Sequence, residues 1–305
     1  MSHALSASSP KRSPKLSLES FAEQAAPVSS GSGGTAVQET SRSARAYVVH
    51  GKAEPPARRF GGGIGVQLET VIGRDDRKRI LDTDLLPWRM ICALEIRGQS
   101  GGGMIGTGWL AGPNTIITAG HCVFHDQIGG WAREIEVSCG RNGFEFPFTT
   151  MRATNFSADS RWVASQDPDY DIGCIHLDPV PGQPSLGEQV GWFAMGALSA
   201  DDLKSQLVNV SGYPADLADG TQQFFHANRV LQITERRVFY DVDTYGGQSG
   251  SPVWIHQHPG DPPIVVAIHA YGISGSLQAN SAPRIDPPIF DLIQSWIRDG
   301  HVPTS

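Results

Sequence analysis

No run of about eighteen apolar residues occurs in the 305-residue chain, so no segment is long enough to form a membrane-spanning helix. The first thirty residues also lack the continuous apolar stretch of a secretory signal. We therefore expect no membrane contact, and the residues by themselves leave the cellular location unassigned.

Cysteine is scarce, and the four cysteines are too scattered for a disulfide framework or for the paired CxxC spacing of a zinc site. They are Cys92, Cys122, Cys139 and Cys174. His121 and His125 stand four residues apart, but no Glu lies between them and no third ligand is evident. We predict no metal site and no cofactor.

Clustered basic residues are lacking after position 69. Residues 1–69 contain eight Lys/Arg and five Asp/Glu, a net charge of +3, whereas the remainder contains sixteen and 26, a net charge of −10. Phosphate backbones are bound by groups of Lys and Arg, so this balance argues against nucleic acid as a partner. We expect a monomer that binds no nucleic acid.

Residues 1–69 are rich in Ser, Ala, Gly and Pro and include the stretches SSGSGG and FGGGIG. Such a composition buries too little apolar surface to offset the entropy cost of ordering the backbone. We expect a flexible N-terminal segment over residues 1–69, followed by one folded domain over residues 70–305.

From Thr70 onward, short alternating apolar runs are separated by Gly, Pro, Asn and Asp, a pattern typical of all-β proteins. Residues 90–97 and 134–139 alternate in this way, and the run IVVAIHAYG from Ile264 fits a central strand. One helix is predicted before Gly300, where apolar residues recur at helical spacing behind two prolines. Its apolar positions are Ile289, Phe290, Ile293, Trp296 and Ile297.

Three residues far apart in the sequence have the chemistry of an activated serine nucleophile. A serine hydroxyl needs a base to accept its proton and a third group to orient that base. Ser249 lies in the Gly-rich stretch DTYGGQSGSP, His121 stands where the segment TIITAGH ends, and Asp171 directly precedes an apolar strand. We predict them to be the nucleophile, the base and the orienting carboxylate.

Other residues compete for two of these roles. Asp167 and Asp169 flank Pro168 in a loop-like stretch, whereas Asp171 adjoins the strand. Ser251 lacks the Gly-x-Ser-Gly placement of Ser249.

The order His, Asp, Ser, with the segments TAGHC, YDIGCIHL and GGQSGSPV, resembles the chymotrypsin-like serine proteases. The resemblance spans most of the chain after residue 70 and implies an all-β fold, a double six-stranded β-barrel with a C-terminal helix. It also implies a serine endopeptidase that uses a Ser-His-Asp acyl-enzyme mechanism on protein or peptide substrates. In that fold, the backbone N–H groups of Gly247 and Ser249 form the oxyanion hole.

Further segments resemble the bacterial glutamyl endopeptidases: TVIGRDDR, GTGWLAGPNTIITAGHC, GRNG, SGYPAD, DTYGGQSGSPV and AIHAYG. This resemblance implies cleavage after Glu, or Asp, with Thr244 and His269 in the specificity pocket. Both side chains can donate to a carboxylate. Asp243 complicates this interpretation, because trypsin carries its basic-specificity Asp at that place. Gln248 replaces the Asp that trypsin-type enzymes pair with a freed N-terminal amine.

The same resemblance implies that the mature enzyme begins near the VIG segment. Cleavage between Glu69 and Thr70 would follow a Glu, so self-processing is a hypothesis, and the freed amine of Thr70 would help neutralise the substrate carboxylate. The family is secreted or periplasmic. Cys122 has lost its usual family partner, with Cys139 as a possible substitute, and Ala270 replaces a Ser that many family enzymes have, so support for Asp171 must come from other donors.

Two further functions remain open at this point: a protease of the same fold with other or broader specificity, and a non-catalytic protease-like binding protein. If the mechanism holds, His121 must be neutral to accept the serine proton, so activity should rise near pH ~6.5. A proton on His269 should favour binding of an anion.

Overall fold

The structure, a computed structural model, describes residues 70–99, 101–204, 206–258, 260–273 and 277–300, and the backbone of residues 48–52. The flexible segment expected over residues 1–69 lies outside the described residues, apart from 48–52. Those five residues form β1 (Val48–Lys52), a strand that the sequence analysis did not anticipate.

The first sheet has eight strands, all paired antiparallel. Their order is β1, β10 (Asn155–Asp159), β11 (Gly173–His176), β5 (Thr115–Thr118), β4 (Gly103–Gly112), β3 (Ile91–Arg97), β8 (Glu134–Cys139) and β9 (Met151–Ala153). A separate hairpin pairs β6 (Phe124–His125) with β7 (Gly130–Trp131).

The second sheet also has eight strands, and only β12 and β17 among them pair in parallel. Their order is β12 (Ala194–Met195), β17 (Ile264–Ile268), β16 (Pro252–Ile255), β13 (Leu207–Gly212), β14 (Phe224–Ile233), β15 (Arg237–Tyr240) and β18 (Asn280–Pro283). The short strand β2 (Lys78–Arg79) adds to β14.

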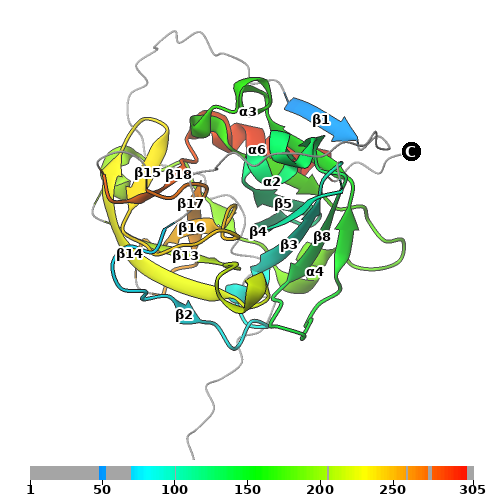
Figure 1. Cartoon of the computed structure of the whole chain (residues 1–305), viewed down its shortest axis with the longest axis horizontal. Coiled ribbons are helices and arrows are strands. Elements are labelled where there is room, and N and C mark those ends of the chain that lie inside the picture. Colours follow the sequence, from blue (N-terminus) through cyan, green and yellow to red (C-terminus); the bar gives the residue numbers. More distant parts are fainter. Residues whose placement is uncertain are drawn as a thin grey trace, which may run out of the picture.

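The expected all-β fold with two curled sheets and a C-terminal helix is confirmed. The sheets lie side by side, with β3, β4, β5 and β8 in one and β13, β14, β16 and β17 in the other (Figure 1). Among the described residues each sheet has eight strands, where the resemblance implied six per barrel.

Helices are short except for the last one. They are α2 (Gly120–Val123), α3 (Ser160–Ser165), α4 (Leu186–Val190), α5 (Ala200–Leu203), α6 (Pro287–Asp299) and the 3-10 turns η1 (Trp88–Met90), η2 (Asp126–Ile128), η3 (Pro168–Tyr170) and η4 (Ala218–Gly220). No helix in the described ranges is long and apolar enough to span a bilayer.

The predicted C-terminal helix is confirmed as α6, which Pro287 and Pro288 begin and Asp286 caps by accepting the N–H of Ile289 at 3.0 Å. One face of the helix is buried: Ile289, Leu292, Ile293 and Trp296. These side chains pack in an apolar cluster that also contains Trp109 and Ile117 of the first sheet and Trp254, Val265 and Ile268 of the second. The helix therefore helps to join the two sheets.

Candidate active site

His121 lies on α2, directly after β5, and Asp171 lies between η3 and β11. The carboxylate of Asp171 holds His121 twice: Oδ2 lies 2.7 Å from Nδ1 of the imidazole, and Oδ1 accepts the backbone N–H of His121 at 2.8 Å. A side chain at Gly120 would meet the ring of Trp162 and Asp171 Oδ1 within 3 Å. The glycine of TAGHC therefore allows this close approach.

The structure distinguishes among the three candidate aspartates. Asp171 is fully buried and faces His121. Asp167 instead caps η3 by accepting the N–H of Asp169 at 3.1 Å. Asp171 is therefore the aspartate that orients the imidazole.

Burial and mutual attraction act in opposite directions on this pair. Burial alone would lower the pKa of His121, but the Asp171 carboxylate outweighs it and raises that pKa well above 6.5. Burial would raise the pKa of Asp171, but His121 and a hydrogen bond from Tyr271 lower it below its usual value. Asp171 therefore stays ionised and favours a proton on His121, so the imidazole becomes neutral, as a general base must be, at a higher pH than the ~6.5 expected from the sequence.

Tyr271 is a residue that the sequence analysis missed. Its ring lies 6.4 Å from the imidazole of His121, centroid to centroid, and its hydroxyl contributes to lowering the pKa of Asp171. The sequence analysis expected support for Asp171 from a residue other than Ala270, and Tyr271 is the next residue along the chain.

The main chain of Ser249 lies beside the residue that follows His121. The carbonyl oxygen of Ser249 accepts the N–H of Thr107 at 2.9 Å and lies 3.7 Å from the thiol of Cys122. Ser251 is buried instead at a position where its hydroxyl faces Gly212 of β13. Of the two serines, Ser249 is therefore the one whose main chain contacts the residue after His121.

The turn before Ser249 requires glycine at position 247. Gly247 has a φ of +101°, and a Cβ there would lie 2.5 Å from the carbonyl oxygen of Tyr213. Thr107 fixes this turn, because its hydroxyl donates to the carbonyl of Gly247 at 2.8 Å and accepts the N–H of Tyr213 at 3.0 Å. The backbone N–H of Gly247 donates to no other residue among those described.

Gln248 stabilises the same loop locally. Its side-chain oxygen accepts the N–H of Tyr245 at 3.1 Å, and its own N–H donates to the carbonyl of Tyr245 at 3.0 Å. Gln248 is buried. Trypsin-type enzymes use this position to bind a freed N-terminal amine, whereas Gln248 closes a turn.

Thr244 and His269, the residues expected in the specificity pocket, are both fully buried. The Thr244 hydroxyl has no hydrogen-bond partner in the described part of the chain, which leaves it able to bind a ligand. Tyr240, another residue that the sequence analysis missed, places its hydroxyl 2.5 Å from Nδ1 of His269. If the tyrosine donates, the proton of the neutral imidazole must sit on Nε2.

The sequence analysis expected a proton on His269 to favour anion binding, and the structure corrects this expectation. Burial, together with the charges of His121 and Arg237, lowers the pKa of His269 to about 3. The imidazole is therefore neutral across the physiological range. It can bind an anion only as a neutral N–H donor.

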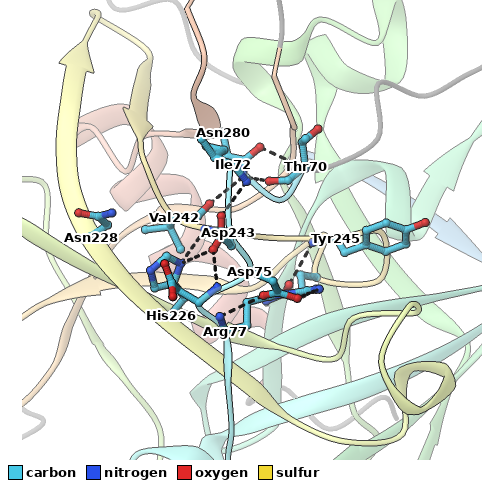
Figure 2. A network of polar contacts seen from close by, with 12 residues as sticks. Thr70, Ile72, Asp75, Arg77, His226, Asn228, Val242, Asp243, Tyr245 and Asn280 are labelled. Atoms are coloured by element: carbon cyan, nitrogen blue, oxygen red, sulfur yellow. Dashed lines mark hydrogen bonds and ion pairs between the residues drawn. The ribbon is translucent and has the colours of Figure 1, made fainter.

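Thr70 lies against the same loop (Figure 2). Its backbone N–H donates to Asn280 Oδ1 at 3.3 Å, and its carbonyl accepts Asn280 Nδ2 at 2.7 Å and the N–H of Thr244 at 3.4 Å. The nitrogen of residue 70 is therefore positioned by β18 and by the loop that contains Thr244.

The sequence analysis considered Cys139 as a partner for Cys122, but the structure shows a different pairing. Cys139 forms a disulfide with Cys92, its facing residue across β3 and β8. Cys122 and Cys174 are free and buried. Because residues 92 and 139 are far apart in the sequence, their pairing becomes evident only from the strand register.

No group of three His, Cys, Asp or Glu side chains among the described residues is arranged to bind a metal ion. His125, considered above as a partner of His121, stacks on Trp162 with ring centroids 6.3 Å apart.

Comparisons with known proteins agree with this geometry. Residues 106–258 match the trypsin-like peptidase domain. A glutamyl endopeptidase of Bacillus licheniformis is 35% identical over 232 residues, which cover 75% of this chain and 69% of the relative. A Bacillus subtilis protein named extracellular metalloprotease is 34% identical, covering 76% of this chain and 71% of the relative.

Solved structures show the same fold. A Glu endopeptidase in complex with MPD superposes with a TM-score of 0.66 at 24% identity, over 75% of this chain and all of that one. The protease Anisep from Arthrobacter nicotinovorans superposes with a TM-score of 0.59 at 16% identity, over 76% of this chain and all of that one.

The pKa values of the two buried histidines should be shifted in opposite directions, upward for His121 and downward for His269. An NMR titration is expected to show His121 losing its proton above pH 6.5, because the Asp171 carboxylate stabilises the imidazolium. His269 is expected to keep a neutral imidazole signal, protonated on Nε2, from pH 8 down to pH 5. A charged His269 within that range would contradict the lowering of its pKa by burial.

Proposed function

Because the chain belongs to the trypsin-like peptidase family, and is a serine endopeptidase acting on protein or peptide substrates, we propose that Ser249, His121 and Asp171 carry its chemistry. The observation that carries this proposal is the double contact of Asp171 with His121, at 2.7 and 2.8 Å, beside the Ser249 main chain. We propose further that the enzyme cleaves after Glu.

In the proposed mechanism, Ser249 Oγ attacks the carbonyl carbon of the scissile peptide bond while its proton moves to Nε2 of His121. Asp171 stabilises the imidazolium that forms. His121 then gives that proton to the leaving amine as the C–N bond breaks. A water molecule, deprotonated by His121, hydrolyses the acyl-enzyme and restores the serine hydroxyl.

The N–H groups of Gly247 and Ser249 are proposed to bind the oxyanion. The positive φ of Gly247 and the bond from Thr107 to its carbonyl hold this turn before substrate arrives. Preorganised donors of this kind lower the barrier by about 3–4 kcal/mol each. The Thr107 hydroxyl therefore contributes by positioning the turn.

Three groups support a pocket for a Glu side chain. The Thr244 hydroxyl is one donor, and Nε2–H of the neutral His269 is a second if Tyr240 donates to Nδ1. The nitrogen of Thr70 lies against the Thr244 loop. If the chain is cut between Glu69 and Thr70, that nitrogen becomes an ammonium. The pocket would then offer one positive charge and two neutral donors to a carboxylate.

The maturation site and the assembly state are part of the proposal. Residues 1–69 would be a pro-segment and residues 70–305 the peptidase domain. Thr70 is held by Asn280 and by the N–H of Thr244, and these contacts support a mature chain that begins there. The net charge of −10 after residue 69 supports protein substrates over nucleic acid, and we propose a monomer.

The names of the two Bacillus relatives imply different chemistries, so the nucleophile needs a direct test. Ser249→Ala should abolish labelling by a serine-directed phosphonate and lower kcat by a factor of about 10³ or more, because the acyl-enzyme cannot form. Full-length Ser249→Ala should also retain its N-terminal segment on incubation, whereas the wild-type protein should begin at Thr70 by N-terminal sequencing.

Ser251→Ala is the matched control. Its hydroxyl is buried without a hydrogen-bond partner among the described residues, so the substitution should preserve folding, labelling and activity. Wild-type activity should also survive a metal chelator. Activity lost to the chelator, with no phosphonate labelling of folded wild-type protein, would contradict the proposal.

Tyr271→Phe tests the donor to Asp171. Loss of a hydrogen bond to a buried carboxylate should leave His121 less well oriented, so kcat should fall roughly tenfold. KM should stay the same, because Tyr271 is a positioning residue that substrate binding does not require. Steady-state kinetics on one Glu peptide provide the check, and an unchanged kcat would remove Tyr271 from this role.

Thr244→Val tests the carboxylate pocket. A panel of peptides that differ only in the residue before the cut (Glu, Asp, Gln, Lys or Phe) should show Glu as the preferred residue. The valine variant should lower kcat/KM for Glu by about ten- to a hundredfold, because a hydrogen bond to a charged group is lost. The loss for Gln should be smaller, since its amide is uncharged.

Thr149→Val, at an exposed position, is the matched control and should match the wild type. Rapid cleavage after Lys or Phe with none after Glu would overturn the Glu specificity while leaving the serine chemistry intact.

A further inference from the structure

Asp243 directly precedes Thr244, and its side chain faces the start of the folded domain (Figure 2). Oδ1 accepts the backbone N–H of Ile72 at 2.7 Å, and Oδ2 accepts that of Asp76 at 2.9 Å. The residue is 2% exposed. Both carboxylate oxygens are thus engaged by one short stretch of main chain, which we call the leading segment (residues 70–77).

His226 adds a third contact on the other side of Asp243. The backbone N–H of Asp243 donates to Nδ1 of His226 at 2.8 Å, whereas that nitrogen lies 3.4 Å from Oδ2. Since Nδ1 accepts in the shorter contact, it carries no proton there, and the hydrogen bond describes the pair better than an ion pair does. The carboxylate is therefore satisfied by main-chain amides.

The remaining contacts of the leading segment join it to β18 and to the loop between β13 and η4. Asn280 of β18 binds Thr70 through two hydrogen bonds and also donates to the carbonyl of Val242 at 2.7 Å. At the other end, Arg77 forms a two-bond ion pair with Asp216, at 3.0 and 2.6 Å. Asp243 contacts the stretch between these two ends.

We infer that Asp243 is a positioning residue for the specificity pocket: it anchors the leading segment so that the nitrogen of residue 70 lies beside Thr244. This inference rests on the proposed Glu specificity and on the proposed cut before Thr70. It gives Asp243 a role unlike that of a pocket aspartate that binds Lys or Arg. In the structure, Asp243 contacts the enzyme's own backbone.

The distances explain why the position of residue 70 should depend on Asp243. Ile72 is only two residues from Thr70, so its bond to Oδ1 restricts the path of the chain just before the pocket. Without the carboxylate, two N–H groups would lose a charged acceptor, and such bonds are roughly twice as strong as neutral ones. The segment would then be held mainly at Asn280 and Arg77.

Asp243→Asn tests this inference in the mature enzyme. An amide side chain offers one acceptor oxygen instead of two and turns an N–H donor toward one backbone N–H. Hydrogen exchange of the Ile72 and Asp76 amides should become at least tenfold faster. kcat/KM for a Glu peptide should fall about tenfold or more, whereas the value for the matching Gln peptide should change less than twofold, because a neutral side chain does not need the amine.

Asp241→Asn is the matched control, since it removes the same charge two residues away without touching the leading segment. It should preserve both the exchange rates and the Glu-to-Gln ratio. If Asp243→Asn speeds exchange but leaves that ratio unchanged, or leaves exchange unchanged, the inference is overturned while the Glu specificity stands. A wild-type enzyme without any preference for Glu over Gln would instead overturn the proposed function.

Folding of the variant is checked by phosphonate labelling of Ser249, which does not depend on the substrate side chain. If Asp243→Asn fails to fold, Asp76→Pro removes one donor to the same carboxylate from an exposed position. Like Asp243→Asn, this variant should lower the ratio of kcat/KM for the Glu peptide to kcat/KM for the Gln peptide. An unchanged ratio in this variant would also overturn the inference.

Discussion

A carboxylate deprived of water must be surrounded by donors, and this constraint organises the site around Asp171. Burial disfavours its charge, yet the backbone N–H and imidazole of His121 and the hydroxyl of Tyr271 keep its pKa below the usual value. The donors come from two residues far apart in the sequence, His121 and Tyr271. The charge that activates His121 thus exists only in the assembled fold, where α2, η3 and the strand end after β17 meet.

The same constraint acts a second time at Asp243, with a different result. Its two oxygens bind amides of residues 72 and 76, so a buried charge next to the pocket ties the beginning of the domain to the loop before the nucleophile. A bare carboxylate there would repel an acidic substrate. Because backbone donors satisfy it, the negative charge is compensated locally, and Thr244 and His269 can present neutral donors.

The sequence was sufficient for features that depend on local pattern. The alternation at residues 90–97 predicted β3, the apolar spacing after Pro287 predicted α6, and the Gly-rich turn indicated the place of Ser249. It was insufficient where a contact joins distant residues. The pairing of Cys92 with Cys139 depends on strand register, and the direction of the Asp243 side chain depends on the path of residues 70–76. The resemblance predicted His269 to be a pocket residue, but its protonation state follows from complete burial, which no local pattern reveals.

A neutral His269 changes how a pocket of this kind can select an acidic residue. A permanently charged partner would attract any anion, whereas neutral donors discriminate mainly by geometry and leave the net attraction to one remaining charge. In the arrangement proposed here, that charge is an amine which does not exist until the chain is cut before Thr70. Selectivity for Glu and removal of residues 1–69 would then depend on the same cut, because the cut that frees the domain also creates the amine that completes its pocket. In this proposal, the contacts of Asn280 with Thr70 and of Asp243 with Ile72 would hold the amine in place before any substrate binds, which is the condition under which a single charge selects most effectively.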